Sequence, residues 1–237
     1  MRSRDQEASA LAVEPRAARI EALACDFDRT LTDLALRPVP QAFAALQRAR
    51  RAGRKVVVVS GRGLDFLERE AGHVADAIVG ENGCFLLHGG KRRCLGPTVD
   101  LRAALADLRI ELEHGELMTS ADVEHEPLLR EALARADVPA DLIRNLDRVM
   151  VLPRGVDKAA GVLAALQALG VEPAHAAAAG DGENDVALLS AVGYGIAVAN
   201  AVPQLKTVAR HVCADVGGHG VARWIENVWL PALEEAI

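Results

Sequence analysis

The chain has 237 residues, of which 51% are hydrophobic, 25% are charged and 3% are aromatic, and its net charge is −6. This composition is typical of a globular protein and excludes fibrous and disordered classes. The acidic balance argues against a nucleic-acid partner, because phosphate binding by charge needs a clustered excess of lysine and arginine. No apolar run approaches the roughly 20 residues that span a bilayer, so no membrane partner is expected.

Residues 1–19 mix both charge signs and lack the apolar centre of a signal peptide, so we interpret them as an N-terminal extension. The four cysteines form no CxxC pair, and the seven histidines show no metal-binding spacing. This pattern predicts reduced thiols in a cytoplasmic protein and no zinc site.

From residue 20 onward, short apolar runs alternate with helical stretches rich in alanine and leucine, which is the pattern of a parallel α/β sheet. The predicted strands are 20–25, 55–59, 77–79, 175–179, 194–199 and 211–214. The predicted helices are 41–51, 158–169, 184–191, 203–210 and a closing helix that contains Trp224 and Trp229. We expect both tryptophans to pack in the core, and Gly170 to end the helix 158–169.

Residues 85–152 interrupt this alternation. The predicted elements there are a hairpin in 84–95, a helix after Asp100, a charged stretch, two helical segments, one with Pro127 in its first turn, and a strand at 148–152. We therefore predict an α/β protein whose core is a doubly wound parallel sheet (Rossmann-like), formed by residues 20–84 and 153–237. Residues 85–152 would form a small inserted α+β cap domain.

Residues capable of chemistry directly follow three of the predicted strands. These segments are Asp26-Phe27-Asp28-Arg29-Thr30, Ser60-Gly61-Arg62-Gly63 and Gly180-Asp181-Gly182-Glu183-Asn184-Asp185. Because ligands of open parallel sheets bind at the carboxyl ends of the strands, we expect the three segments to converge. Four clustered carboxylates stay ionised only beside a cation, and hard oxygen ligands suit Mg²⁺.

A phosphate would complete such a site. Ser60 and the backbone of Gly61 and Gly63 can donate hydrogen bonds to phosphoryl oxygens, and Lys158 adds a positive charge at the start of its helix. A phospho-acceptor signalling domain also gathers acidic residues, Ser or Thr, and Lys at strand ends. Such domains are roughly half this length and lack a late GDxxxD motif, so this non-enzymatic alternative is the more distant one.

The four motifs resemble those of the haloacid dehalogenase-like phosphohydrolases. They are Asp26-x-Asp28-x-Thr30, Ser60, Lys158 and Gly180-Asp181-x-x-x-Asp185. The insertion, flanked by Gly80-Glu81-Asn82-Gly83 and Arg154-Gly155-x-x-Lys158, resembles the cap of the Cof-type branch. Arg29 departs from the pattern, because the family commonly has glycine at this position; the departure leaves the chemistry intact and places a guanidinium near the mouth of the site.

The resemblance implies a Mg²⁺-dependent phosphatase. Asp26 would be the nucleophile that forms an aspartyl-phosphate, and Asp28 would be the general acid and base. Mg²⁺ would be held by Asp26, the Asp28 carbonyl, Asp181 and Asp185. The phosphate-binding residues would be Thr30, Ser60, Gly61, Lys158 and Asn184, with Thr30 orienting its loop. A helix N-cap is an equally good interpretation of Asn184.

The substrate implied is a small phosphorylated metabolite. Chain length and cap size are most similar to the archaeal-type phosphoglycolate phosphatases, and sugar phosphates remain open as substrates. A phosphosugar mutase keeps the same four motifs and is the alternative activity. Arg144, Asn145 and Arg148 are the cap residues we expect to matter for specificity. The protein is expected to be a monomer or a homodimer.

Overall fold

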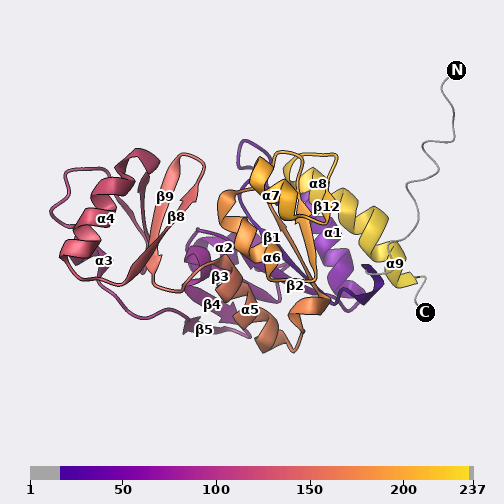
Figure 1. The fold of residues 1–237 in the computed structure, drawn as a ribbon. Helices are drawn as coiled ribbons and strands as arrows, with labels where there is room; N and C mark the ends of the chain where they lie inside the picture. The colour runs from indigo at the N-terminus through magenta and orange to yellow at the C-terminus, as the bar shows by residue number, and fades with distance from the viewer. Residues whose placement is uncertain (1–16, 235–237) are drawn as a thin grey trace, which may run out of the picture.

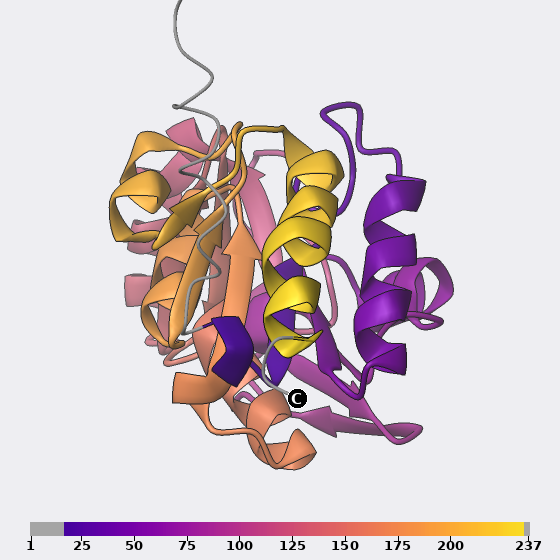
Figure 2. The same cartoon turned by 90° about the vertical axis from the view of Figure 1, so that its right-hand side faces the viewer.

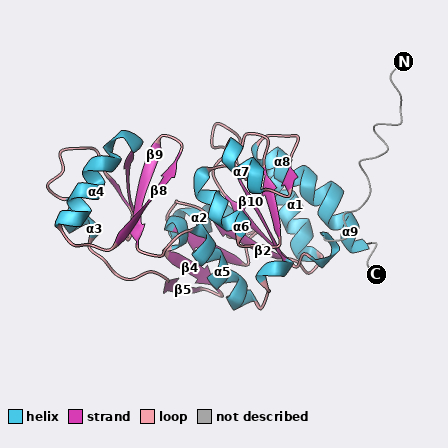
Figure 3. Ribbon diagram, in the orientation of Figure 1, coloured by secondary structure: helices cyan, strands magenta, loops and turns pink. Residues whose placement is uncertain are grey.

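A computed structural model describes residues 17–234. Its larger sheet has eight strands, shown in Figures 1 and 3. In spatial order they are β12 (His211–Val212), β11 (Tyr194–Ala197), β10 (Ala176–Gly180), β1 (Ala22–Asp26), β2 (Lys55–Val59), β3 (Ala77–Gly80), β4 (Phe85–His88) and β5 (Lys91–Cys94). The first six strands in this order are parallel, and β4 and β5 are antiparallel additions. The predicted α/β class is therefore confirmed.

The strand register brings the predicted motifs to one edge of this sheet. Asp26 at the end of β1 pairs with Val59 at the end of β2, so Ser60 follows alongside. On the other side of β1, Cys25 pairs with Ala179 of β10, so Asp181 follows at the same level. The chain leaves β1 and β10 in opposite directions across the sheet, and this switch point is where open α/β sheets bind ligands.

Helices cover both faces of the large sheet. Right-handed crossovers place α1 (Pro40–Arg51) and α2 (Leu64–Ala71) on one face, where α8 (Gly217–Trp224) packs beside α1 (Figure 2). The opposite face carries α5 (Lys158–Leu169), α6 (Val186–Ser190) and α7 (Pro203–Val208). A π-helical turn at Ile225–Trp229 leads from α8 into α9 (Leu230–Glu234). Apart from α2, which was not predicted, these helices match the predicted ones.

The core is assembled from the residues that the patterns indicated. All of β1 and β10 is buried, as expected of strands covered on both faces. Trp224 and Trp229 are both buried and pack together, with ring centroids 5.8 Å apart. Gly170 ends α5 in the left-handed conformation, at φ 72°. The four cysteines are free. Across residues 17–234, every helix is too short or too polar to span a bilayer.

A second, antiparallel sheet lies beside the first (Figure 1). Its order is β6 (Glu113–His114), β7 (Thr119–Asp122), β9 (Arg148–Pro153) and β8 (Ala140–Asn145). One face packs on α3 (Leu101–Leu105) and α4 (Glu126–Arg135), through a separate apolar cluster that includes Val149 and Val151. Because side chains alternate along a strand, Arg148 and Met150 point away from these helices and toward the large sheet.

Several predictions for the insertion need correction. The hairpin of β4 and β5 is present, but it extends the large sheet through pairing with β3 and does not belong to the second sheet. The second predicted helical segment is instead β8, in which alternating Ala140 and Leu142 pack on the helices. The charged stretch contains the short strands β6 and β7. The division into domains stays a prediction. Most of the predicted N-terminal extension, residues 1–16, lies outside the described residues.

Candidate active site

Three of the predicted acidic residues meet at the carboxyl ends of β1 and β10. Asp26, Asp181 and Asp185 each present a carboxylate oxygen, and these three oxygens lie within 4.8 Å of one another. The Lys158 ammonium, at the first residue of α5, joins two of them, with Nζ 2.6 Å from Asp26 Oδ1 and 2.7 Å from Asp185 Oδ1. All four side chains are buried. The structure thus brings residues from three distant motifs into one charged cluster.

The loop after β10 holds Asp185 in place through its backbone. Asp185 Oδ2 accepts hydrogen bonds from the amides of Asp181 and Gly182, each at 3.0 Å. This close approach requires the glycine at position 180, because a Cβ there would lie 2.5 Å from Asp185 Cγ. Both oxygens of Asp185 therefore have donors within the protein.

Burial and mutual repulsion control the protonation of this cluster. Burial raises the pKa of Asp26 well above its ordinary range, and Asp185 and Asp181 add to the rise against the opposing charge of Lys158. Burial and the Asp185 carboxylate raise the pKa of Asp181 to about 6. Burial alone would lower the pKa of Lys158, but Asp185 and Asp26 outweigh burial and hold it above its ordinary value. The cluster therefore favours binding a further cation.

The carboxylate cluster fits a Mg²⁺ ion. Its three acidic side chains supply hard oxygen donors from two strand ends, which suits this cation. Asp28 does not join the cluster, because its carboxylate pairs with Arg62 in a bidentate contact, at 2.8 and 3.2 Å. This geometry agrees with the expectation that Asp28 would contribute only its backbone carbonyl, and that contribution stays a prediction.

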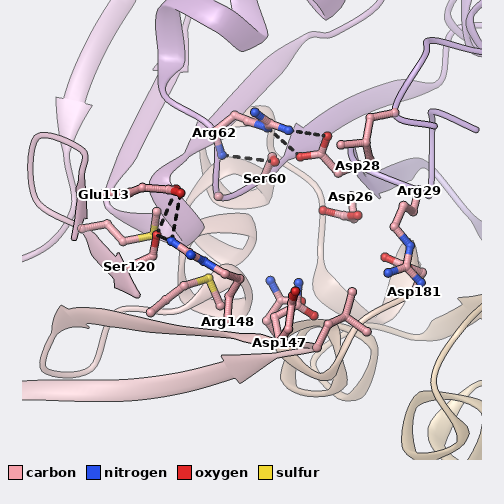
Figure 4. Close-up of a pocket in the computed structure, with 17 residues that line it drawn as sticks. Asp26, Asp28, Arg29, Ser60, Arg62, Glu113, Ser120, Asp147, Arg148 and Asp181 are labelled. Atoms are coloured by element: carbon pink, nitrogen blue, oxygen red, sulfur yellow. Dashed lines mark hydrogen bonds and ion pairs between the residues drawn. The ribbon is translucent and has the colours of Figure 1, made fainter. Parts of the chain in front are cut away.

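The predicted phosphate loop follows β2. The Ser60 amide donates to Val79 O of β3 at 3.0 Å. Ser60 Oγ accepts from the Arg62 amide at 3.2 Å, as Figure 4 shows. Ser60 and Gly61 both line a cavity of about 470 Å³, and Asp26 and Asp28 line the same cavity. This volume is within the range of small-molecule sites.

The remaining predicted phosphate contacts differ in position. Asn184 lines the cavity; its Nδ2 donates to Asn82 Oδ1 at 3.2 Å, whereas its buried Oδ1 has no partner among the described residues. Thr30 is fully buried, and its hydroxyl also has no partner within 17–234. Lys158 contacts Asp26 and Asp185 but is absent from the residues that line the cavity. Their phosphate contacts stay predictions.

The opposite wall of the cavity comes from the second sheet. It consists of Glu113, Met118, Ser120, Asn145, Leu146, Asp147, Arg148 and Met150. Arg148 contacts Ser120 Oγ and Glu113, each at 3.1 Å, as Figure 4 shows. Of the three cap residues expected to matter, Asn145 and Arg148 line the cavity. Arg144 points to the other face of β8 and pairs with Glu126 of α4.

Sequence reasoning missed the residues that join the two sheets. Glu81 is buried, and its carboxylate accepts hydrogen bonds from the amides of Glu116, Leu117 and Met118, at 2.7, 2.9 and 2.9 Å. At the other end of the cavity, the Leu146 amide donates to Glu183 Oε2 at 2.9 Å, in an exposed contact. The Gly80–Gly83 string was visible in the sequence, but nothing in it indicated which residues Glu81 contacts.

Comparison with known proteins identifies the family. A family model described as haloacid dehalogenase-like hydrolase matches residues 120–225. A phosphoglycolate phosphatase from Methanothermobacter thermautotrophicus is 31% identical over 88% of this chain and 98% of its own length. One from Pyrobaculum neutrophilum is 32% identical over 87% of this chain and 94% of its own. The chain is a haloacid dehalogenase-like hydrolase.

Solved structures agree with this assignment at the level of the fold. A Thermoplasma acidophilum protein superposes with a TM-score of 0.76 at 20% identity, over 87% of this chain and 97% of that one. A subclass IIB sugar phosphatase of the same superfamily gives a TM-score of 0.73 at 18% identity, over 87% and 98%. This haloacid dehalogenase-like hydrolase is a phosphatase, which confirms the predicted enzyme class.

Proposed function

We propose that this phosphatase hydrolyses phosphoglycolate, or a similarly small phosphorylated acid, through an aspartyl-phosphate on Asp26. The observation that carries the proposal is the position of two carboxylates at one end of a small cavity. Asp26 is held by Lys158 within the acidic cluster, and Asp28 stands apart from that cluster on Arg62. Two aspartates two residues apart thus have different surroundings, which suits them to different roles.

In the first half of the reaction, an Asp26 oxygen attacks phosphorus while the bond to the leaving oxygen breaks, and Asp28 gives that oxygen a proton. In the second half, Asp28 takes a proton from the water that attacks the aspartyl-phosphate. Inorganic phosphate leaves, and Asp26 returns to its starting form. Ser60 and the Gly61 backbone line the cavity where the phosphoryl oxygens would lie, so they can donate to them.

Asp26, Asp181 and Asp185 are the side chains that would hold Mg²⁺. When bound, the ion supplies positive charge that offsets repulsion between the attacking carboxylate and the phosphate dianion. Lys158 adds a fixed charge to the same side of the site and keeps the Asp26 carboxylate oriented through its 2.6 Å contact.

The phosphoglycolate assignment is supported by the names of the relatives and by the size of the cavity. An acid group on the leaving part of the substrate would need a cation on the wall opposite Asp26. Arg148 lies on that wall. Its guanidinium is oriented by Asp122 at 2.7 Å as well as by Glu113 and Ser120.

The test is a phosphate-release assay with phosphoglycolate, a panel of sugar phosphates and an aryl phosphate. We expect phosphoglycolate to give the highest kcat/KM and Asp26→Asn to abolish turnover of every substrate while the protein stays folded. Conversion of a sugar phosphate into its positional isomer without release of phosphate would contradict hydrolysis and support the mutase. A preference for a neutral sugar phosphate would overturn only the substrate assignment.

A further inference from the structure

Arg29 occupies an unusual position in the loop that follows the nucleophile. Its backbone is left-handed, at φ 60°, a conformation that residues other than glycine rarely adopt. The loop holds it there through a hydrogen bond from the Arg29 amide to Thr32 Oγ1, at 2.6 Å. The side chain lines the catalytic cavity, as Figure 4 shows. An arginine maintained in a glycine-like conformation at this place calls for a physical reason.

The contact made by the side chain provides that reason. Arg29 Nη2 lies 3.1 Å from Asp181 Oδ2, and the two side chains are 25% and 7% exposed. Asn200 supports both partners: its Nδ2 donates to the Arg29 carbonyl at 3.2 Å and to Asp181 Oδ2 at 3.3 Å. Asn200 is itself fixed by the Gly217 amide, which donates to its Oδ1 at 2.7 Å.

This pair adds a second cation of the protein to the carboxylate cluster. Lys158 contacts Asp26 and Asp185, and Arg29 contacts the third carboxylate, Asp181. Each member of the cluster therefore has a cationic partner supplied by the protein. A divalent ion that binds between these carboxylates must share Asp181 with the guanidinium, and two cations on one carboxylate repel each other.

We propose that Arg29 is a positioning residue that holds Asp181 in the metal-free enzyme and weakens Mg²⁺ binding by competing for this carboxylate. The inference rests on the proposed metal site. It also gives the left-handed arginine a function, since its guanidinium lies 3.1 Å from Asp181 Oδ2. Removing the charge at position 29 then has two consequences: the metal binds more tightly, and the metal-free protein loses stability.

The test measures Mg²⁺ binding by calorimetry and thermal unfolding with EDTA or saturating Mg²⁺. Arg29→Gln removes the charge and keeps a side chain, Arg29→Gly also relaxes the backbone, and Arg29→Lys keeps the charge. We expect both neutral variants to bind Mg²⁺ about tenfold more tightly. We expect Arg29→Lys to stay within about threefold of wild type. The gap between the two unfolding temperatures should widen in Arg29→Gln, because its EDTA form is the destabilised one.

Arg62→Gln is the matched control, because it also removes a guanidinium from this cavity. The partner of Arg62 is Asp28, which lies outside the carboxylate cluster. A smaller gain in affinity for this variant supports the specific competition at Asp181, and an equal gain overturns it. Unchanged or weaker Mg²⁺ binding in Arg29→Gln also overturns the inference. A wild-type protein that shows neither binding heat nor a thermal shift with Mg²⁺ refutes the metal site itself, which distinguishes the two failures.

Discussion

Replacing Lys158 by methionine tests the charge balance at the bottom of the site. The variant keeps a side chain of similar length but removes two contacts, of 2.6 and 2.7 Å, between groups that are at most 5% exposed. Breaking a buried ion pair by removing one partner costs about 3–5 kcal/mol. The carboxylates left without Lys158 can instead take up a proton. Protonating one ordinary carboxyl at pH 7 costs about 4 kcal/mol, so this route limits the loss of stability to a similar value.

We therefore expect the free energy of unfolding of Lys158→Met in EDTA to fall by about 3–4 kcal/mol at pH 7. The loss should shrink on acidification. In the variant, one buried carboxyl of the folded state binds a proton with a raised pKa and releases it on unfolding. Proton binding by the folded state therefore stabilises the variant at low pH, and this stabilisation is lost as pH rises. For one proton the slope is about 1.4 kcal/mol per pH unit between the unfolded and folded pKa values.

The assay is urea unfolding at pH 5, 6, 7 and 8, with Lys55→Met as the control, because Lys55 is an exposed lysine at the start of β2. The control should lie within about 0.5 kcal/mol of wild type at each pH. A Lys158→Met protein as stable as wild type at pH 8 would refute the reasoning, as would a loss that does not change with pH.

Three further predictions concern catalysis. EDTA should abolish phosphatase activity, and Mg²⁺ should restore it. Because the pKa of Asp181 is raised to about 6, protons should compete with Mg²⁺ below that pH. An affinity for Mg²⁺ that calorimetry finds equal at pH 5 and pH 8 would contradict this competition. Asp28→Asn should slow hydrolysis of alkyl phosphates by about 10²–10⁴-fold and of aryl phosphates far less, so equal losses would exclude the general-acid role. Arg148→Ala should raise KM for phosphoglycolate. Arg144→Ala should not raise it, because the Arg144 guanidinium pairs with Glu126 on the helix side of β8. Equal effects of the two variants in steady-state kinetics would contradict this division.

The parallel part of the large sheet was predictable because its signals are local and repeated, whereas β4 and β5 were assigned to the insertion. Each buried parallel strand is a short apolar run, and the chemistry-bearing residues follow it directly. The convergence of Asp26, Ser60 and Asp181 then follows from the general rule about carboxyl ends of strands. The site could be assembled from the sequence because parallel register leaves little freedom in where those residues lie.

The second sheet was harder to predict because β7 and β8 mix polar and apolar residues and so lack the continuous apolar runs of the parallel strands. Without knowing that 140–145 is a strand, the alternation that separates Arg144 from Asn145 cannot be used, and both residues look equally eligible for the cavity. The Glu81 and Arg29 contacts were beyond sequence reasoning for a different reason. Each joins residues far apart in the chain, and no local pattern identifies the partner.

Two of the contacts between the sheets differ in burial and in the number of their hydrogen bonds. The buried Glu81 carboxylate accepts hydrogen bonds from three amides, whereas Glu183 accepts a single exposed hydrogen bond from the Leu146 amide. Both contacts use a carboxylate acceptor, so they differ in number and burial: three bonds are shielded at Glu81, and one is open to water at Glu183. We therefore expect the β8–β9 turn to separate from the large sheet more readily than the loop that Glu81 binds. Separation at that turn would open the cavity beside Asn184 and the loop that follows β10.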